Sequence, residues 1–321
     1  MKKIVAIGAA VLALSALEAV AQVYPSKPIR MFVGFSAGSA TDIVARVVSK
    51  GLSERIGQPI VIDNKTGAGG SLAGEAVAKA APDGYTLLTV SSAIAVNPAV
   101  YAKLPFDVEK DLTAIANVGT LPLVLLVNRS LPATNLREFI QYAKTRPGEL
   151  HYGSSGKGGS IHLATELLNT VAGIKLVHVP YRGNPQAVTA LMGGEVQVLV
   201  DTVLLAAPNL KSQKVAALAI TGTARSPLAS ELPTFAEAGL PAYNAGLFFG
   251  IMGPAGLPRD IVDKLNAEIN VVLKSPDAES RLGTAGGLQI AGGSSVQFAD
   301  LMRAELAKWK QIADVSGIKA E

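Results

Sequence analysis

Apolar residues along the chain form two kinds of segment that alternate: short continuous runs and longer stretches with helical spacing. The run IRMFV (29–33) precedes residues 40–56, where apolar side chains share one helical face at Ile43, Val44, Val47, Val48, Leu52 and Ile56. The runs PIVID (59–63) and YTLLTV (85–90) follow, and a helix that ends near residue 81 is expected between them after NKTGAGGS. This order predicts a parallel sheet with helices on both faces.

The same alternation begins a second time at LHYGSS (150–155). We expect a helix from Ile161 and another from Pro185, together with the strands KLVHVPY, EVQVLVD and KVAALAIT. Two long apolar stretches, 116–128 and 245–254, flank this second block. Helices over 258–274 and 295–315, with a short strand near LQIAGG between them, complete the predicted elements.

The two apolar stretches are interpreted as crossover strands, one leaving a first domain and one returning to it. The predicted boundaries are 22–121 with 245–321 for domain 1 and 122–244 for domain 2. The fold class is therefore α/β with two domains and a cleft between them. Ligands of open α/β sheets bind beyond the carboxyl ends of the strands, so the loops at those ends are expected to face the cleft.

The N-terminus has the form of a cleavable signal peptide over residues 1–21. Lys2 and Lys3 precede an apolar, Ala-rich segment that runs to Leu17, and Ala19-Val20-Ala21 is an A-x-A cleavage site. The apolar segment is shorter than the roughly 20 residues that a bilayer span requires. We therefore expect an exported, periplasmic protein.

Composition narrows the chemistry that the chain can perform. Cysteine is absent, which excludes a disulfide framework, a thiol nucleophile and a Cys-ligated metal. The three histidines are scattered and form no zinc-binding spacing. The net charge is +4, and Lys and Arg are spread along the chain rather than massed, so no nucleic-acid partner is expected. No cofactor or metal is predicted, and we expect a monomer.

The stretch GFSAG (34–38) has the G-x-S-x-G form of a nucleophile elbow, with Ser36 as the nucleophile of a secreted esterase. In that fold several strands precede the nucleophile, whereas only about 14 residues of the expected mature chain precede Ser36. The available histidines are His151, His162 and His178, and none lies in a late loop. An esterase is kept as the minor alternative.

The stretch GSSGKGGS (153–160) resembles a phosphate-binding loop only superficially. That motif needs a Gly five residues before the Gly-Lys glycine and a Ser or Thr after the Lys. His151 and Gly158 occupy these two positions, so the pattern fails.

Gly- and Ser-rich loops open three of the predicted helices, at GFSAGSATD, KTGAGGS and GSSGKGGS. Each presents free backbone N–H groups at the positive end of a helix dipole, and this arrangement binds anions. Two such loops in different domains, facing each other across a cleft, would each hold one carboxylate. A ligand with two separated carboxylates is therefore favoured.

Blocks along the chain resemble the Bug-type receptors, the solute-binding proteins of tripartite tricarboxylate transporters. The resemblance rests on KPIRMFVGFSAGSATDIVARVV, GQPIVIDNKTGAGGSLAGEAVAKAAPDGYTLL, NPAVYAKLPFDVEKDLTAI, HYGSSGKGGSIHLATELL, VHVPYRGNPQAVTALMGGEVQVLVD and LPTFAEAGLP. It covers essentially the whole mature chain. It implies a periplasmic binding protein of the Venus-flytrap type, without catalysis. It also implies an organic carboxylate as ligand, either a di- or tricarboxylate or an aromatic acid, and delivery to a two-subunit membrane permease.

The resemblance also implies which residues hold the ligand. The family's first loop corresponds to Phe35, Ser36, Ala37, Gly38, Ser39, Ala40 and Thr41. Its second loop corresponds to Ser154, Ser155, Lys157, Gly158, Gly159, Ser160 and His162. Further positions expected at the cleft are Ser91, Ser92, Tyr181, Asp201 and Thr202.

The first loop departs from the family form P-F-x-P-G-G-x-T-D. Both prolines are missing and Ser39 replaces a glycine, so the loop is expected to be more adaptable and gains two hydroxyls. Ser36 and Ser39 either donate to a carboxylate or cap the following helix. Arg182 either pairs with a carboxylate or forms a structural salt bridge. Asp201 either binds an ammonium or hydroxyl group of the ligand or caps a helix.

Three hypotheses follow from the sequence. The first is a carboxylate receptor for uptake through a permease. The second is a sensory or scavenging carboxylate receptor without its own permease, which would share the same cleft. The third is the secreted esterase that uses Ser36.

Overall fold

The computed structural model describes residues 24–319 except 155, 182–183 and 211–213. The predicted signal peptide and the predicted site residues Ser155 and Arg182 therefore lie outside the described residues. The elements up to the first crossover are β1 (Ile29–Val33), α2 (Ala40–Ile56), β2 (Ile60–Asn64), η1 (Ala68–Gly70), α3 (Ser71–Ala78), β3 (Thr86–Ser91), α4 (Ala93–Val100) and α5 (Val108–Asp111).

Helix α2 shows how local sequence sets the boundaries of an element. Ser39 is the N-cap, and its hydroxyl accepts a hydrogen bond from the backbone N–H of Asp42 at 3.2 Å. Gly57 ends the helix in the left-handed conformation, with φ of 69°. Apolar side chains at helical spacing, Val44 and Val48 among them, are buried against the sheet. The helix begins and ends where the sequence predicts.

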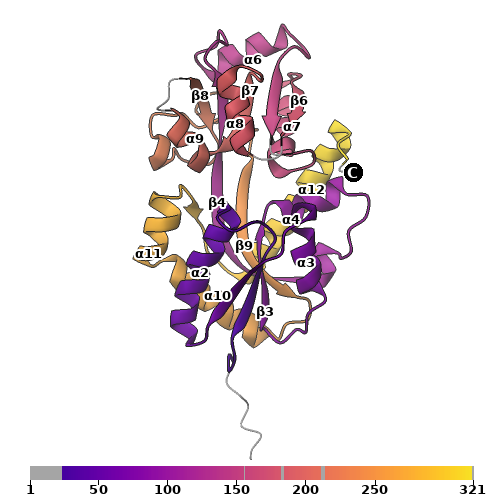
Figure 1. The fold of residues 1–321 in the computed structure, drawn as a ribbon, viewed down its shortest axis with the longest axis vertical. Coiled ribbons are helices and arrows are strands. Elements are labelled where there is room, and N and C mark those ends of the chain that lie inside the picture. Colours follow the sequence, from indigo (N-terminus) through magenta and orange to yellow (C-terminus); the bar gives the residue numbers. More distant parts are fainter. Residues whose placement is uncertain (1–23, 155, 182–183, 211–213, 320–321) are drawn as a thin grey trace, which may run out of the picture.

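The elements between the two crossovers form the upper domain in Figure 1. They are α6 (Leu136–Lys144), β5 (His151–Ser154), α7 (Ser160–Ala172), β6 (Val177–Pro180), α8 (Asn184–Gly193), β7 (Val198–Thr202), α9 (Val203–Leu210), β8 (Val215–Ile220) and η2 (Pro227–Ala229). Strand β5 pairs in parallel with both β6 and β7, as the alternation of strand and helix predicts.

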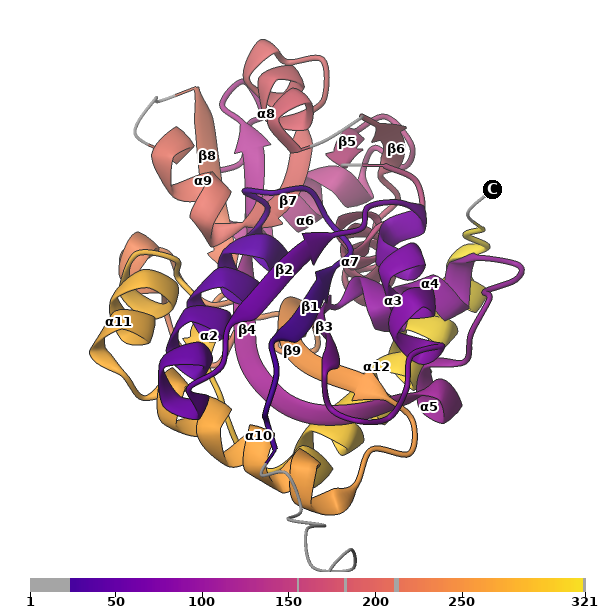
Figure 2. The ribbon, with the colours of Figure 1, turned by 60° about the horizontal axis from the view of Figure 1, so that its bottom comes forward.

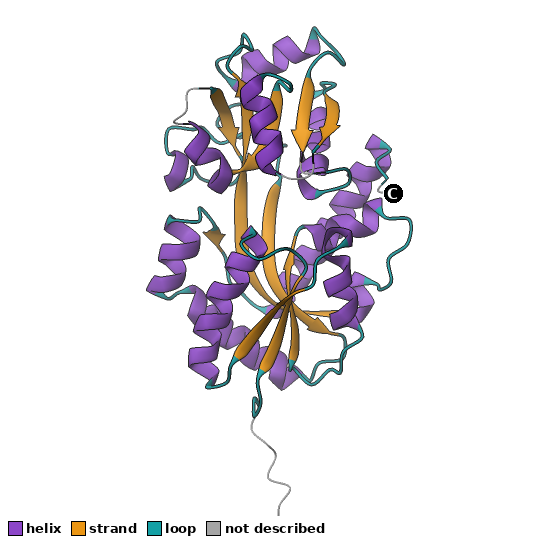
Figure 3. Cartoon of the chain, viewed as in Figure 1, coloured by secondary structure: helices purple, strands orange, loops and turns teal. Residues whose placement is uncertain are grey.

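Two strands connect the domains. Strand β4 (Leu112–Asn128) runs through both, and β9 (Gly246–Pro254) pairs with it antiparallel (Figure 3). Both predicted crossover stretches are thus confirmed as strands. Because β4 also pairs with β7 and β8, the main path of the sheet is continuous in the order β2-β1-β3-β9-β4-β7-β5-β6.

The sheet differs from the predicted parallel one because the crossovers reverse direction. Strand β1 is parallel to β2 and β3, but β9 is antiparallel to β3 and to β4. A chain that returns to its first domain must run back beside the strand by which it left, and this makes the pair antiparallel. Figure 2 shows β1, β2 and β3 lying between α2 on one side and α3 on the other.

The chain after β9 packs on both domains. It contains α10 (Arg259–Leu273), α11 (Pro276–Ala278), η3 (Glu279–Thr284), β10 (Gln289–Ile290) and α12 (Ser295–Ser316). Strand β10 pairs with β4 at Gly119 and Thr120. Helix α12 packs on α4 and also on α7 of the upper domain. None of the helices among the described residues is long and apolar enough to cross a membrane.

The register of the crossover strands places the strand ends of the two domains opposite one another. Ser91, the last residue of β3, pairs with Phe249, which in turn pairs with Gly119 of β4. Thr202, the last residue of β7, pairs with Leu123 of β4. The two strand ends are thus four residues of β4 apart, or about 13 Å at the usual rise per residue. Loops that follow these ends face each other between the domains.

Candidate functional site

The first predicted ligand loop, residues 35–41, follows Gly34, which packs backbone to backbone against the Gly-rich loop that precedes α3. A Cβ atom on Gly34 would lie 2.5 Å from the Cα of Gly70, so only glycine permits this approach. Gly38 has φ of 81°, in the region that favours glycine. Sequence thus fixes the loop through its glycines, although both prolines of the family pattern are absent.

A buried carboxylate holds the same loop. Asp42 is 1% exposed and accepts hydrogen bonds from the backbone N–H of Gly38 at 2.9 Å and from Arg46 at 2.7 and 3.1 Å. Asn64, at the end of β2, donates from Nδ2 to Asp42 at 2.9 Å and to the carbonyl of Phe35 at 2.9 Å. Both ends of the loop are therefore tied to one network.

The hydrogen bonds set the charge state of that carboxylate. Burial alone would raise the pKa of Asp42, but the bonds from Arg46, Gly38 and Asn64 outweigh it and hold the pKa below the ordinary value of 3.8. An acidic residue in the first turn of a helix is ordinarily explained by the helix dipole alone. The role of Asp42 in fixing the loop depends on Asn64, 22 residues away, and so is visible only in the fold.

Around this loop the predicted residues differ in exposure. Ser36, Ala37 and Gly38 are exposed, Ser39 and Ala40 are half-buried, and Thr41 is buried. The hydroxyl of Ser39 serves as the N-cap of α2 but retains its own proton as a donor. The first turn of α2 thus combines exposed loop backbone with a positive helix end.

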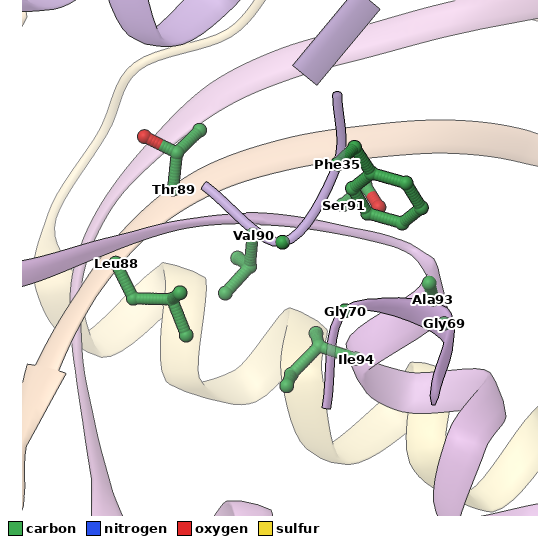
Figure 4. A pocket seen from close by; sticks show the side chains of 10 residues that line it. Phe35, Gly69, Gly70, Leu88, Thr89, Val90, Ser91, Ala93 and Ile94 are labelled. Carbon is green, nitrogen blue, oxygen red and sulfur yellow. The ribbon is translucent and has the colours of Figure 1, made fainter. Parts of the chain in front are cut away.

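A pocket with about 230 Å³ of empty space, including the part open to solvent, lies at the ends of β1 and β3. Phe35 and Ser91, both predicted, line it, and Figure 4 shows the Phe35 ring beside Ser91. Gly69, Gly70 and Thr89 also line the pocket and were not predicted as site residues. The glycines had a visible signal, because their loop was recognised as one of the three helix-opening loops.

Ser91 and Ser92 are adjacent but do different things. Ser91 lines the pocket, whereas Ser92 is fully buried. The hydroxyl of Ser92 accepts a hydrogen bond from the N–H of Phe248 at 2.8 Å and donates to the carbonyl of Gly246 at 3.2 Å. Ser92 therefore joins the end of β3 to the returning crossover strand.

In the upper domain, Ser154 orders the second predicted loop from within. Its side chain is fully buried, and its hydroxyl lies 2.6 Å from Nε2 of His178. The same oxygen accepts from the N–H of Gly156 at 3.1 Å and lies 3.0 Å from the carbonyl of Gly156. A hydroxyl that donates to this carbonyl accepts from Nε2–H of His178 and from the N–H of Gly156.

His162 supports the loop from the following helix. Its Nδ1 accepts a hydrogen bond from the N–H of Gly158 at 2.9 Å, so in the neutral ring the proton is on Nε2. The His162 and His178 rings stack with centroids 3.7 Å apart, and Tyr152 stacks on His178 at 5.0 Å. Burial is the main cause that lowers the pKa of His162 to about 3 and that of His178 to about 4, with the charge of Lys157 adding to both.

The remaining predicted residues lie around these two loops. Lys157 is exposed, while Gly159 is the N-cap of α7 and provides no side-chain cap. Ser160 is half-buried in the first turn. Tyr181, also half-buried, donates its backbone N–H to the carbonyl of Ser154 at 2.9 Å.

Asp201 and Thr202 are the last two residues of β7. Both are buried, and one carboxylate oxygen of Asp201 accepts from the N–H of Thr202 at 2.7 Å.

Among the described residues, no group of three or more His, Cys, Asp or Glu side chains is arranged to hold a metal ion. The hydroxyl–imidazole pair of Ser154 and His178 is sealed from solvent at the serine, because Ser154 is 0% exposed.

Two α/β domains, joined by two crossover strands and carrying Gly-rich helix openings at facing strand ends, define the class of periplasmic solute-binding proteins. Within that class, residues 44–318 match the model of the tripartite tricarboxylate transporter family receptor, and the chain belongs to this family. The resemblance found in the sequence is thereby confirmed, as is the fold class.

Individual proteins and solved structures are similar to this chain over most of its length. Protein BugT of Bordetella pertussis is 35% identical over 301 residues, which cover 93% of this chain and 92% of that protein. A solved structure of Rpa4515 of R. palustris with adipate superposes with a TM-score of 0.80 at 36% identity and covers 92% of this chain and 99% of that one. The structure of MatC of Rhodopseudomonas palustris with bound malate superposes with a TM-score of 0.76 at 33% identity and covers 90% of this chain and 99% of that one. The structure of the periplasmic binding protein BugD also superposes, with a TM-score of 0.77 at 27% identity, and covers 93% of this chain and 100% of that one.

Proposed function

We propose that the protein is an extracytoplasmic receptor that captures an organic carboxylate between its domains and delivers it to a two-subunit membrane permease. One observation carries this proposal. The Gly- and Ser-rich openings of α2 and α7 follow β1 and β5, and the strand pairings direct the carboxyl ends of β1 and β5 from the two domains toward each other. Helix openings of this kind bind anions through backbone N–H groups.

The chemistry of the relatives supports a carboxylate ligand. Adipate and malate, which are bound in the two structures named above, are both dicarboxylates. In this chain a carboxylate would meet the first turn of α2, whose loop is held by Asp42 and Asn64. The loop is thus ordered before the ligand arrives, which reduces the entropy lost on binding.

The expected domain boundaries, 22–121 with 245–321 and 122–244, are part of this proposal. So are the signal peptide over 1–21 and a monomeric state. In the proposed receptor Ser36, Ser39 and Ser160 donate to the ligand. Ser154 and Ser92 act indirectly, because their hydroxyls hold the loop and the crossover strand.

Calorimetric titration with malate, adipate and a panel of other carboxylates tests the proposal. We expect at least one acid to bind with a Kd in the micromolar range or below and to raise the melting temperature at saturation. Adipamide, which has the shape of adipate without its charge, is the matched control and is expected not to bind. The proposal would be falsified if no carboxylate in the panel gave heat or a thermal shift.

Delivery needs a separate test. Membrane vesicles that contain the cognate permease are expected to take up the identified acid only when the purified receptor is added. Binding without receptor-dependent uptake would contradict the transport role and leave a receptor that acts in sensing or scavenging.

A further inference from the structure

A second pocket lies between the domains on the side of the sheet covered by α2. It holds about 280 Å³ of empty space, including the part open to solvent. Ile43 and Val44 of α2 form one wall and Leu204 of α9 forms the facing wall. Leu121 of β4 and Phe249 of β9 form the floor. We call this space the α2–α9 pocket.

The lining of the α2–α9 pocket is apolar with one cation. Phe249 and Leu121 are 1% and 2% exposed, so the floor is as buried as the core. Ile43, in contrast, is 36% exposed although it lies in the first turn of a helix that buries most of its apolar face. Arg281 lines the pocket with a half-exposed side chain and lies 3.9 Å from Asp277, longer than a hydrogen-bonded pair. An apolar space beside a guanidinium suits an amphiphilic anion.

The α2–α9 pocket is continuous with the α2 opening. Ala40, the first residue of α2, lines the pocket and belongs to the turn whose N–H groups point out of the helix. A carboxylate bound at that turn therefore has its carbon skeleton next to Ile43. Since Leu204 follows the end of β7 in the other domain, the same skeleton would touch both domains.

We propose that the α2–α9 pocket receives the apolar body of the ligand, so that the receptor selects carboxylates with a hydrocarbon chain or ring over short, polar ones. This inference rests on the proposed carboxylate-binding function. It adds which part of the ligand determines the selectivity of the receptor. An occupant that touches both α2 and α9 also favours the closed arrangement of the domains.

Titration with succinate and adipate tests the size preference, since the two differ by two methylene groups. Burial of each methylene is expected to tighten the Kd about fourfold, so adipate is expected to bind about 16-fold more tightly than succinate. Equal affinities, or tighter binding of succinate, would overturn the inference while leaving the carboxylate function intact. If neither these two acids nor any other carboxylate bound, the function itself would fail and the inference with it.

Substitutions in the walls test the location. Ile43→Asn and Leu204→Asn place an amide in the α2–α9 pocket at positions that are not fully buried, which limits the effect on folding. Each substitution is expected to raise the Kd for adipate about tenfold and the Kd for succinate less than threefold. Val271→Asn, at a valine of α10 that is 46% exposed, is the matched control and is expected to change neither Kd.

A melting temperature measured for each variant separates loss of the site from loss of the fold. The inference is supported when the variants melt close to the unsubstituted protein and lose the preference for adipate. The inference is overturned when folded variants keep the preference for adipate, or when the Kd values for succinate and adipate rise by the same factor.

Discussion

At the scale of single residues, most polar side chains near the predicted loops hold the loops rather than point at a ligand. The carboxylate of Asp42 and the hydroxyls of Ser92 and Ser154 are buried and bonded to backbone. Ser36 is exposed at the opening of α2, and Ser39 and Ser160 are half-buried at the openings of α2 and α7. Buried polar groups must be paired, so the serines that follow buried strands become structural and those in exposed loops remain available.

Asp42→Asn is expected to destabilise the protein by about 1–3 kcal/mol near neutral pH, because charge-assisted hydrogen bonds from Arg46 are lost. Since the pKa of Asp42 is lower in the folded than in the unfolded state, its contribution is present above the unfolded value of 3.8 and is lost as the pH falls through the folded value. In urea unfolding, the difference in the free energy of unfolding between the unsubstituted protein and Asp42→Asn should therefore shrink at acid pH.

Asp63→Asn is the matched control for Asp42→Asn. Asp63 pairs with Arg30 at the surface, where an ion pair contributes little, so a loss below about 1 kcal/mol is expected. Equal losses in the two variants would contradict the role assigned to Asp42.

The stacked histidines predict a second dependence on pH. The pKa values of His162 and His178 are lowered to about 3 and about 4 from 6.5, so below pH 6.5 the unfolded state binds more protons than the folded state. Stability is then expected to fall toward pH 4 by at most about 1.4 kcal/mol per pH unit for each histidine. In urea titrations at several pH values, His178→Phe should reduce this slope, and an unchanged slope would refute the assignment.

At the scale of elements, the decisive feature is how α2 and α7 begin. Helix α2 has a serine cap that leaves its loop backbone exposed, whereas α7 begins at Gly159 without a side-chain cap. Both helices exceed three turns, so each has a substantial dipole. The same physical device thus occurs once in each domain, and the proposal of a ligand with more than one anionic group rests on this arrangement.

Ser39→Asp separates capping from ligand binding. Aspartate caps a helix as well as serine does, so stability is expected to change by less than about 1 kcal/mol. The added charge occupies the positive end of α2, so the Kd for the best acid of the panel is expected to rise at least about tenfold, as measured by calorimetry. Ser294→Asp at the N-cap of α12 is the control, and it should leave the Kd unchanged.

At the scale of the whole molecule, the two domains share their cores. One cluster of buried side chains contains Val90 of β3, Leu168 of α7 and Trp309 of α12, which come from both domains and the C-terminal helix. Packing of α12 on α7 joins the domains on that side, so relative motion is expected to open the opposite side, where the α2–α9 pocket lies.

Shared cores predict a single cooperative unfolding transition. Leu168→Ala, at a fully buried position in the upper domain, is expected to destabilise the protein by about 2–5 kcal/mol. The chain has one tryptophan, Trp309, so its fluorescence reports on α12 while circular dichroism reports on all helices. The two midpoints should shift together; separate midpoints would show that the domains unfold independently.

Hydrophobic periodicity predicted α2, α10, α12 and both crossover strands close to their observed bounds, because the segments are long and their apolar residues follow a regular pattern. Helices α4, α6 and α9 were not predicted. Two of them contain a proline, Pro98 in α4 and Pro208 in α9, and α4 and α9 are apolar on most sides, so neither shows a helical pattern. In the structure, α4 packs mainly on α12, and α9 packs on β4 and β8.

The sequence by itself determined the alternation of strand and helix, the two crossovers, the family and the Gly- and Ser-rich loops that open helices. These features are local, or depend on motifs that can be read along the chain. Only the tertiary structure decided which hydroxyls are buried, that Asn64 and Asp42 hold one loop, and that α2 and α9 enclose an apolar pocket. Such contacts join residues far apart in sequence, and burial is a property of the packed chain rather than of any one segment.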